Sequence, residues 1–130
     1  MTVLVIDDDP NVTEMIRDAL QSNGYRCLVA SSAEEADAQL AANEVDGVTL
    51  DLRMPGRSGL EWLETLESVR PGLARKTLLV TGSQLGPDQI RQLRRCGATL
   101  LFKPFCIERL LVELADRLVK IAAPSPPPAA

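Results

Sequence analysis

The chain has 130 residues, of which 45% are hydrophobic and 25% charged, and its formal net charge is −4 without any histidine. This length predicts one domain, the acidic balance argues against direct nucleic-acid binding, and no apolar run is long enough to cross a membrane or act as a signal peptide. Because the three cysteines are widely spaced and form no C-x-x-C pair, we expect reduced thiols and a cytoplasmic location.

The first half of the chain predicts alternating strands and helices. Residues 3–6 are a continuous apolar run, typical of a strand buried on both faces of a parallel sheet. Asp9 and Pro10 provide a cap and a first residue for the helix that follows, which Asn23-Gly24 ends. The next elements are a strand at 25–30, a helix from Ser31-Ser32 through Leu40, and a strand at 45–50 that ends at Asp51.

The same alternation continues in the second half. Helices are expected at 59–69, 87–96 and 107–121, and strands at 78–80 and 100–102. Strands alternating with helices of this length favour a parallel sheet covered on both faces. We therefore expect one α/β domain over residues 1–122. The Pro/Ala-rich residues 123–130 predict a disordered tail, either a natural terminus or the start of a linker.

Polar side chains follow four of the predicted strands at the point where each strand ends. They are Asp7 and Asp8, Asp51, Thr81, and Lys103. In an open parallel sheet, ligands bind outside the carboxyl ends of the strands. Each of these residues alone is more often a turn former or a solvated side chain than a ligand. Their arrival together at one edge favours a functional site.

The residue types in this set indicate phosphoryl chemistry beside a metal ion. Three neighbouring carboxylates repel one another unless a cation neutralises them. Oxygen ligands without His or Cys suit a hard ion such as Mg²⁺ or Mn²⁺. A hydroxyl and a lysine can spread the charge of a phosphoryl group, and a carboxylate is a competent nucleophile for phosphoryl transfer.

Four motifs in fixed order resemble one known family, the receiver domains of two-component response regulators. The segment 3–10, VLVIDDDP, is similar to the family's first strand and acidic pair, and 51–59, DLRMPGRSG, to its D-x-x-M-P-x-x-x-G phosphorylation loop. Residues 79–82, LVTG, resemble the strand with the switch hydroxyl, and 103–105, KPF, the lysine signature. Each motif is weak alone, but the ordered set, covering about residues 3–121, is specific.

The resemblance implies a flavodoxin-like doubly wound sheet of five parallel strands in the order 2-1-3-4-5, with five helices. It implies that Asp51 is the phosphoacceptor. Asp8 and Asp51 would bind Mg²⁺ (or Mn²⁺) through their carboxylates and Arg53 through its backbone carbonyl, while Asp7 would act through water. Thr81 and Lys103 would contact the phosphoryl group. The bond before Pro104 would be cis.

The resemblance also implies partners. The phosphoryl donor would be a phosphohistidine on a sensor histidine kinase or phosphotransfer protein. This chain has no histidine, so it cannot itself be that donor. The domain would assist its own phosphorylation and dephosphorylation without being an enzyme in the ordinary sense. The two apolar stripes of the last predicted helix are consistent with a homodimer through the last two helices as well as with ordinary packing. Arg91, Arg94 and Arg95 on the preceding helix are consistent with contact with an acidic partner as well as with a solvated face.

Two positions depart from the family pattern. Leu100 occupies the place where the family often has an aromatic switch residue three positions before the lysine. Phe102 lies nearby, but we expect it on the opposite face of the strand, because adjacent positions point to opposite sides. Gly82 replaces the alanine often found after the threonine, which predicts a more open pocket and a shorter-lived phosphoryl group.

Two other functions remain as alternatives. A pseudo-receiver binds partners without phosphorylation, and it usually lacks an acid, the hydroxyl or the lysine, all of which are present here. Haloacid-dehalogenase-type phosphatases carry an Asp nucleophile after the first strand in a D-x-D-x-T/V pattern. Asp7 and Asp9 fit its acids, but Asn11 occupies the T/V position, and Asp9 also fits a helix cap. The modified residue, Asp7 or Asp51, distinguishes the phosphatase from the receiver.

Overall fold

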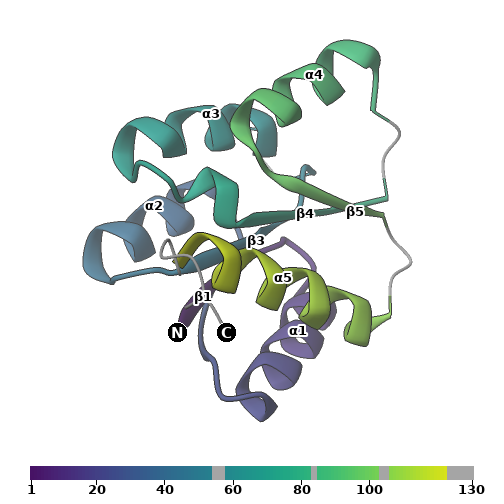
Figure 1. Cartoon of the computed structure of the whole chain (residues 1–130). Coiled ribbons are helices and arrows are strands. Elements are labelled where there is room, and N and C mark those ends of the chain that lie inside the picture. Colours follow the sequence, from purple (N-terminus) through teal and green to yellow (C-terminus); the bar gives the residue numbers. More distant parts are fainter. Residues whose placement is uncertain (54–57, 83–84, 103–105, 123–130) are drawn as a thin grey trace, which may run out of the picture.

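The sheet and its helices have the predicted connectivity. The computed structural model describes residues 1–53, 58–82, 85–102 and 106–122, without the side chains of 119–122. Five parallel strands form one sheet in the order β2-β1-β3-β4-β5 (Figure 1). The strands are β1 (Thr2–Ile6), β2 (Arg26–Ala30), β3 (Gly47–Leu50), β4 (Thr77–Thr81) and β5 (Thr99–Phe102). The α-helices of the described chain are α1 (Pro10–Ser22), α2 (Ala33–Ala42), α3 (Gly59–Val69), α4 (Pro87–Cys96) and α5 (Ile107–Ala122).

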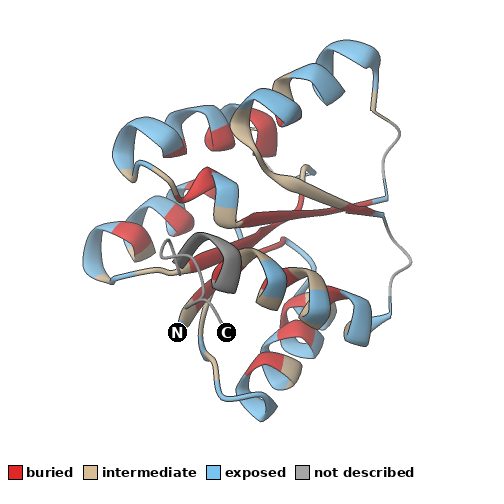
Figure 2. Ribbon diagram, viewed as in Figure 1, coloured by how far each residue is buried: buried red, intermediate tan, exposed pale blue. Residues whose placement is uncertain are grey.

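Two apolar cores lie on opposite faces of the sheet. Leu4 and Ile6 of β1 join the cluster under α2, α3 and α4, whereas Val3 and Val5 join the cluster under α1 and α5. This alternation follows from the two-residue period of a strand. Because both faces are covered, β1 is buried along almost its whole length (Figure 2), which confirms the prediction from its continuous apolar run.

Helix starts follow the predicted caps. The Asp9 side chain accepts a hydrogen bond from the Asn11 N–H at 2.9 Å, and Pro10 is the first residue of α1. Ser32 caps α2 and Ser58 caps α3 in the same way. Each cap supplies an acceptor for an N–H that has no partner within its helix, which fixes where the helix begins.

The structure differs from the prediction in two details of the connections. Strand β3 begins at Gly47, because its pairing with β1 begins where Gly47 meets Val3. A short 3-10 helix, η1 (Ala74–Lys76), precedes β4 and was not predicted from the sequence. The hydroxyl of Thr77 donates to the Leu73 carbonyl at 3.0 Å and holds this turn against the start of β4.

The expected placement of Phe102 was wrong. Leu100 packs against the core under α2, α3 and α4, and Leu101 packs against the other core. Phe102 is two residues after Leu100, so it lies on the same face of β5 as Leu100, and it is 55% exposed. An aromatic side chain therefore lies on the same face as Leu100, the position of the usual switch residue, but two residues closer to the carboxyl end of β5.

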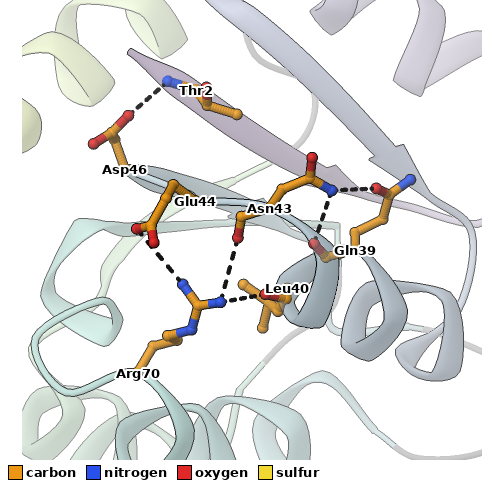
Figure 3. Close-up of polar contacts among 7 residues, drawn as sticks. All are labelled: Thr2, Gln39, Leu40, Asn43, Glu44, Asp46 and Arg70. Carbon is orange, nitrogen blue, oxygen red and sulfur yellow. Dashed lines mark hydrogen bonds and ion pairs between the residues drawn. The ribbon is translucent and has the colours of Figure 1, made fainter.

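Arginine side chains hold the sheet edge opposite the strand carboxyl ends. Arg70, which follows α3, donates to the carbonyls of Leu40 and Asn43 at the end of α2 and pairs with Glu44 at 4.0 Å (Figure 3). Arg117 of α5 donates to the carbonyls of Gly97 and Arg75. These bonds satisfy carbonyls that the ends of helices and turns leave without partners.

Candidate functional site

The site begins with the pairing of β1 and β3. Ile6 is opposite Leu50, so Asp7 and Asp51 leave neighbouring strands at the same level. The Asp51 N–H donates to the Ile6 carbonyl at 2.9 Å and extends the ladder by one bond. Sheet register therefore places the two predicted acids side by side at the carboxyl edge, where open α/β sheets bind ligands.

Three carboxylates meet at this edge. Asp7, Asp8 and Asp51 each offer an oxygen within 4.8 Å of the others. Asp7 is 3% exposed and Asp51 5% exposed, while Asp8 is open to solvent. Two buried acids beside a third one repel one another, and a bound cation relieves that repulsion.

Backbone N–H groups orient the two buried carboxylates. The Asp9 N–H donates to Oδ1 of Asp7 at 2.9 Å, and the Arg53 N–H donates to Oδ1 of Asp51 at 3.0 Å. In each case the donor lies two residues after the acid, so the local turn itself fixes the carboxylate. One oxygen of Asp51 is thereby held by the chain.

Gly59 is required by the close approach of α3 to the acid loop. A Cβ at this position would lie 2.8 Å from the Asp51 carbonyl oxygen and 2.8 Å from the Leu52 Cα, both backbone atoms. The Gly59 N–H donates to the Leu52 carbonyl at 3.2 Å. The final glycine of the phosphorylation-loop motif thus has a steric reason to be there, which the sequence pattern alone did not reveal.

Thr81 stands at the same edge on the next strand. It ends β4 and is fully buried, two residues beyond Leu79, which pairs with Leu50. Thr81 is paired with Phe102, the last residue of β5. Lys103, the predicted phosphate-contacting residue, follows Phe102 in the chain but lies outside the described residues. So does Pro104, for which the sequence predicted a cis bond.

The donor set fits a hard divalent cation. Around Asp7, Asp8 and Asp51 the ligand atoms of the cluster are oxygens, as Mg²⁺ and Mn²⁺ prefer. Arg53, the predicted carbonyl ligand, lies two residues after Asp51 and has an exposed side chain. The structure therefore brings together the predicted acidic metal ligands.

Asp9 has a structural role in this arrangement. Its side chain is exposed and caps α1, and it is not a member of the acidic cluster. The phosphatase alternative needed Asp9 as the second acid of its motif. The geometry instead pairs Asp7 with Asp8 and Asp51.

Comparisons with known proteins identify the family of the chain. The family model for the response regulator receiver domain matches residues 3–115. The chain is 37% identical over 114 residues to the probable transcriptional regulatory protein TcrX of Mycobacterium tuberculosis, covering 88% of this chain and 48% of that protein. It is 29% identical over 113 residues to the phosphate regulon regulatory protein PhoB of Pseudomonas aeruginosa, covering 87% of this chain and 49% of that protein.

Solved structures give the same result. A CheY-like receiver domain from Methanospirillum hungatei superposes with a TM-score of 0.87 at 25% identity, covering 95% of this chain and 98% of that one. The chemotaxis protein CheY4 of Vibrio cholerae superposes with a TM-score of 0.79 at 28% identity, covering 88% and 96%.

The fold and the acidic edge define a regulatory α/β domain of two-component signalling. The chain belongs to the response regulator receiver domain family. Receiver domains are in general phosphoacceptor regulatory domains rather than classical enzymes. The chain spans about half the length of the two curated regulators named above. Within its described residues, no helix is long and apolar enough to cross a membrane.

Proposed function

We propose that Asp51 accepts a phosphoryl group from a phosphohistidine of a sensor histidine kinase or phosphotransfer protein. A carboxylate oxygen of Asp51 attacks the phosphorus, the P–N bond breaks, and the electron pair of that bond stays on the donor imidazole. The product is an aspartyl phosphate. Hydrolysis by water returns Asp51 to its carboxylate and releases inorganic phosphate, so the domain assists both its own activation and its own reset.

The observation that carries this proposal is the buried Asp51 within 4.8 Å of two further acids. The Arg53 N–H engages Oδ1 of Asp51, which orients the carboxylate at the edge of the sheet. Asp8 and Asp51 would hold Mg²⁺ or Mn²⁺ with the Arg53 carbonyl, and Asp7 would act through water. The ion, when bound, neutralises charge on the phosphoryl oxygens.

Thr81 and Lys103 complete the proposed chemistry. The buried Thr81 hydroxyl would donate to a phosphoryl oxygen, and the Lys103 ammonium would pair with another. Phosphorylation adds roughly −1.5 to −2 charges at Asp51. Thr81 ends the strand that precedes α4, so its response to this charge would reach α4 and change the output surface.

We test this with intact mass after incubation with acetyl phosphate and Mg²⁺, on the wild type and on Asp51→Asn. The expected result is a metal-dependent phosphoryl adduct that Asp51→Asn abolishes. The matched control is Asp46→Asn, because Asp46 also accepts a backbone N–H, that of Thr2 at 2.7 Å, but at the opposite end of β1. An adduct that survives in Asp51→Asn would move the nucleophile to Asp7. If the wild type forms no adduct, even with a phosphorylated kinase, the domain is a pseudo-receiver that acts without phosphorylation.

A cytoplasmic location belongs to the same proposal. The three cysteines are free thiols: Cys27 lies in β2, Cys96 ends α4, and Cys106 directly precedes α5. Free thiols are typical of a reducing compartment. We keep the prediction that this domain does not itself bind nucleic acid, because its net charge is −4.

We also propose homodimerisation through the last two helices. Val112 of α5 is 64% exposed, and Ile90 of α4 and Phe102 of β5 are exposed apolar side chains on neighbouring elements. Arg91, Arg94 and Arg95 of α4 and Glu108 of α5 are exposed and carry opposite charges, which could pair between two copies. Size measurement before and after acetyl phosphate tests it, and a monomer in both states would remove the dimer.

A further inference from the structure

Helix α4 is attached to the domain unevenly along its length. Residues 86–91 are exposed, and Leu93 is the buried residue of the helix (Figure 2). Beyond Leu93, Cys96 and Ala98 also pack against the core. At the start of the helix, Leu85 packs against the same core, and the exposed Gln89 side chain accepts from the Gly86 N–H at 3.0 Å. The C-terminal half of α4 is therefore the better anchored half.

The turn after α4 is built around Gly97. Its φ is +81°, a left-handed conformation, and its N–H donates to the carbonyls of Leu93 at 3.0 Å and Arg94 at 3.2 Å. A Cβ at Gly97 would lie 3.0 Å from Cγ of Arg75, so η1 lies directly against this turn. Glycine is needed here for its backbone conformation and for the close approach.

Arg117 ties this turn to two other elements. Its Nη1 donates to the Gly97 carbonyl at 3.0 Å and to the Arg75 carbonyl at 3.3 Å. Arg117 comes from α5, which covers the opposite face of the sheet from α4. One guanidinium thus joins the end of α4, η1 and α5, and hydrogen bonds from a charged donor are the stronger kind.

We propose that Arg117 is a positioning residue that fixes the C-terminal end of α4, so that the helix pivots at Gly97. A change at Thr81 reaches α4 through its N-terminal end, where residues 86–91 are exposed. That half then moves while the half beyond Leu93 stays in place. The movement of α4 rests on the proposed phosphorylation of Asp51. The tether, by which we mean the hydrogen bonds of Arg117 to the Gly97 and Arg75 carbonyls, is present without phosphorylation.

The test is residue-resolved amide hydrogen exchange by NMR on the wild type, Arg117→Ala and Arg117→Lys, with Arg70→Ala as the matched control. Arg70 also donates to backbone carbonyls at the end of a helix, in its case α2. At rest, Arg117→Ala is expected to speed exchange at Gly97 and Ala98 about tenfold, the effect of one lost hydrogen bond to a charged donor. Arg117→Lys, which keeps a single ammonium, is expected to lie between.

Arg70→Ala is expected to speed exchange at the end of α2 and to leave Gly97 unchanged. The slowest core amides of β1 report global stability in every variant. If Gly97 exchanges no faster in Arg117→Ala than in Arg70→Ala, after correction for those core amides, Arg117 is no tether and the proposal fails. This comparison of exchange rates is made without phosphorylation, so it tests the tether even if Asp51 accepts no phosphoryl group.

With acetyl phosphate and Mg²⁺, at equal adduct occupancy by mass, the wild type is expected to change exchange from Ile90 to Gln92 and not beyond Leu93. In Arg117→Ala the change is expected to extend through Gly97, and in Arg70→Ala it should stop where it does in the wild type. A general loss of stability in Arg117→Ala would speed exchange at rest, but it would not shift the position along α4 at which the phosphorylation-induced change ends. A change that already spans the whole helix in the wild type overturns the pivot.

Discussion

The two edges of the sheet are stabilised by opposite kinds of group. At the carboxyl edge, Asp7 and Asp51 are buried acids that accept from the N–H groups of Asp9 and Arg53. At the other edge, Arg70 and Arg117 donate to backbone carbonyls. The carboxyl edge concentrates negative charge, which a bound cation or a phosphoryl group can change. At the opposite edge, these donors and acceptors are already satisfied by hydrogen bonds within the chain.

This difference indicates where the domain can respond. Carboxylates that crowd one another are poised for a ligand, because binding a cation relieves their repulsion. Arginines that fill the acceptor sites of carbonyls gain nothing from a ligand, and they join elements that are far apart in the chain. We therefore expect the chemistry at the carboxyl edge, while the bonds of Arg70 and Arg117 keep the elements at the opposite edge fixed when another part of the domain moves.

The largest effect is expected for Gly59→Ala at the carboxyl edge. Its new Cβ would meet the Asp51 carbonyl oxygen and the Leu52 Cα at 2.8 Å, and both are backbone atoms that cannot turn away. We expect a loss of about 1–3 kcal/mol in the free energy of unfolding, typical of overpacking. Asp51 phosphorylation should also slow, because the acid loop must shift. Urea unfolding and adduct formation by mass measure the two effects.

Gly86→Ala is the control for Gly59→Ala. Nothing lies within 4 Å of a Cβ at Gly86, so the change should cost no more than about 0.5 kcal/mol, the size of a surface substitution. Equal losses in the two variants would show that the approach of α3 to Asp51 is not tight.

The next effect is expected for Arg70→Ala at the opposite edge. The substitution removes the donor to the Leu40 and Asn43 carbonyls, and the side chain is 31% exposed, so water can replace part of what is lost. We expect a loss of about 1–2 kcal/mol in unfolding free energy with an unchanged rate of Asp51 phosphorylation. Slower phosphorylation would contradict the separation of the two edges.

Arg91→Ala is the matched arginine control. Within the described residues, Arg91 pairs with Asp88 one turn away on the same helix, and both side chains are exposed. Such a pair contributes little to stability, so we expect a change of at most about 0.5 kcal/mol.

The carboxyl edge could be predicted from the sequence, because its residues carry local signals. Asp7, Asp8 and Asp51 follow short apolar runs, and strand pairing does the rest. The caps at Asp9 and Ser32 are equally local. Periodicity therefore indicated the strands, the helices and which acids meet, whereas the role of each site residue was predicted from the resemblance to the receiver family.

The opposite edge could not be predicted in this way. Arg70 meets Leu40 across 30 positions, and Arg117 meets Arg75 across 42. An arginine at a helix end looks like a solvated charge until the fold places a carbonyl beside it. Phe102 was misplaced for a different reason, since the rule for adjacent strand residues was applied to Leu100 and Phe102, which are two residues apart. Lys103 lies outside the described residues.

A third test concerns Cys27 in β2, the outermost strand of the sheet next to β1. Burial raises the pKa of the Cys27 thiol from 9.0 to about 11, against the lowering effect of Arg17. Unfolded Cys27 would ionise first, so its contribution to stability is present below pH 9.0 and is lost as the pH rises toward about 11. At about pH 8 we expect iodoacetamide to modify Cys27 at least tenfold more slowly than an ordinary thiol. Peptide mapping measures this, with the exposed Cys106 as the internal reference.

The smallest effect is expected for Gly82→Ala, beside Thr81 at the carboxyl edge. Gly82 is exposed and follows the buried Thr81 directly, so a methyl group there would cover part of the path that water takes to the aspartyl phosphate. We expect the phosphoryl group to last a few-fold longer with little change in stability. The decay of the adduct after removal of acetyl phosphate, followed by intact mass, gives the lifetime. If the variant loses its phosphoryl group as fast as the wild type, water reaches the site by another route, and Gly82 does not set the lifetime.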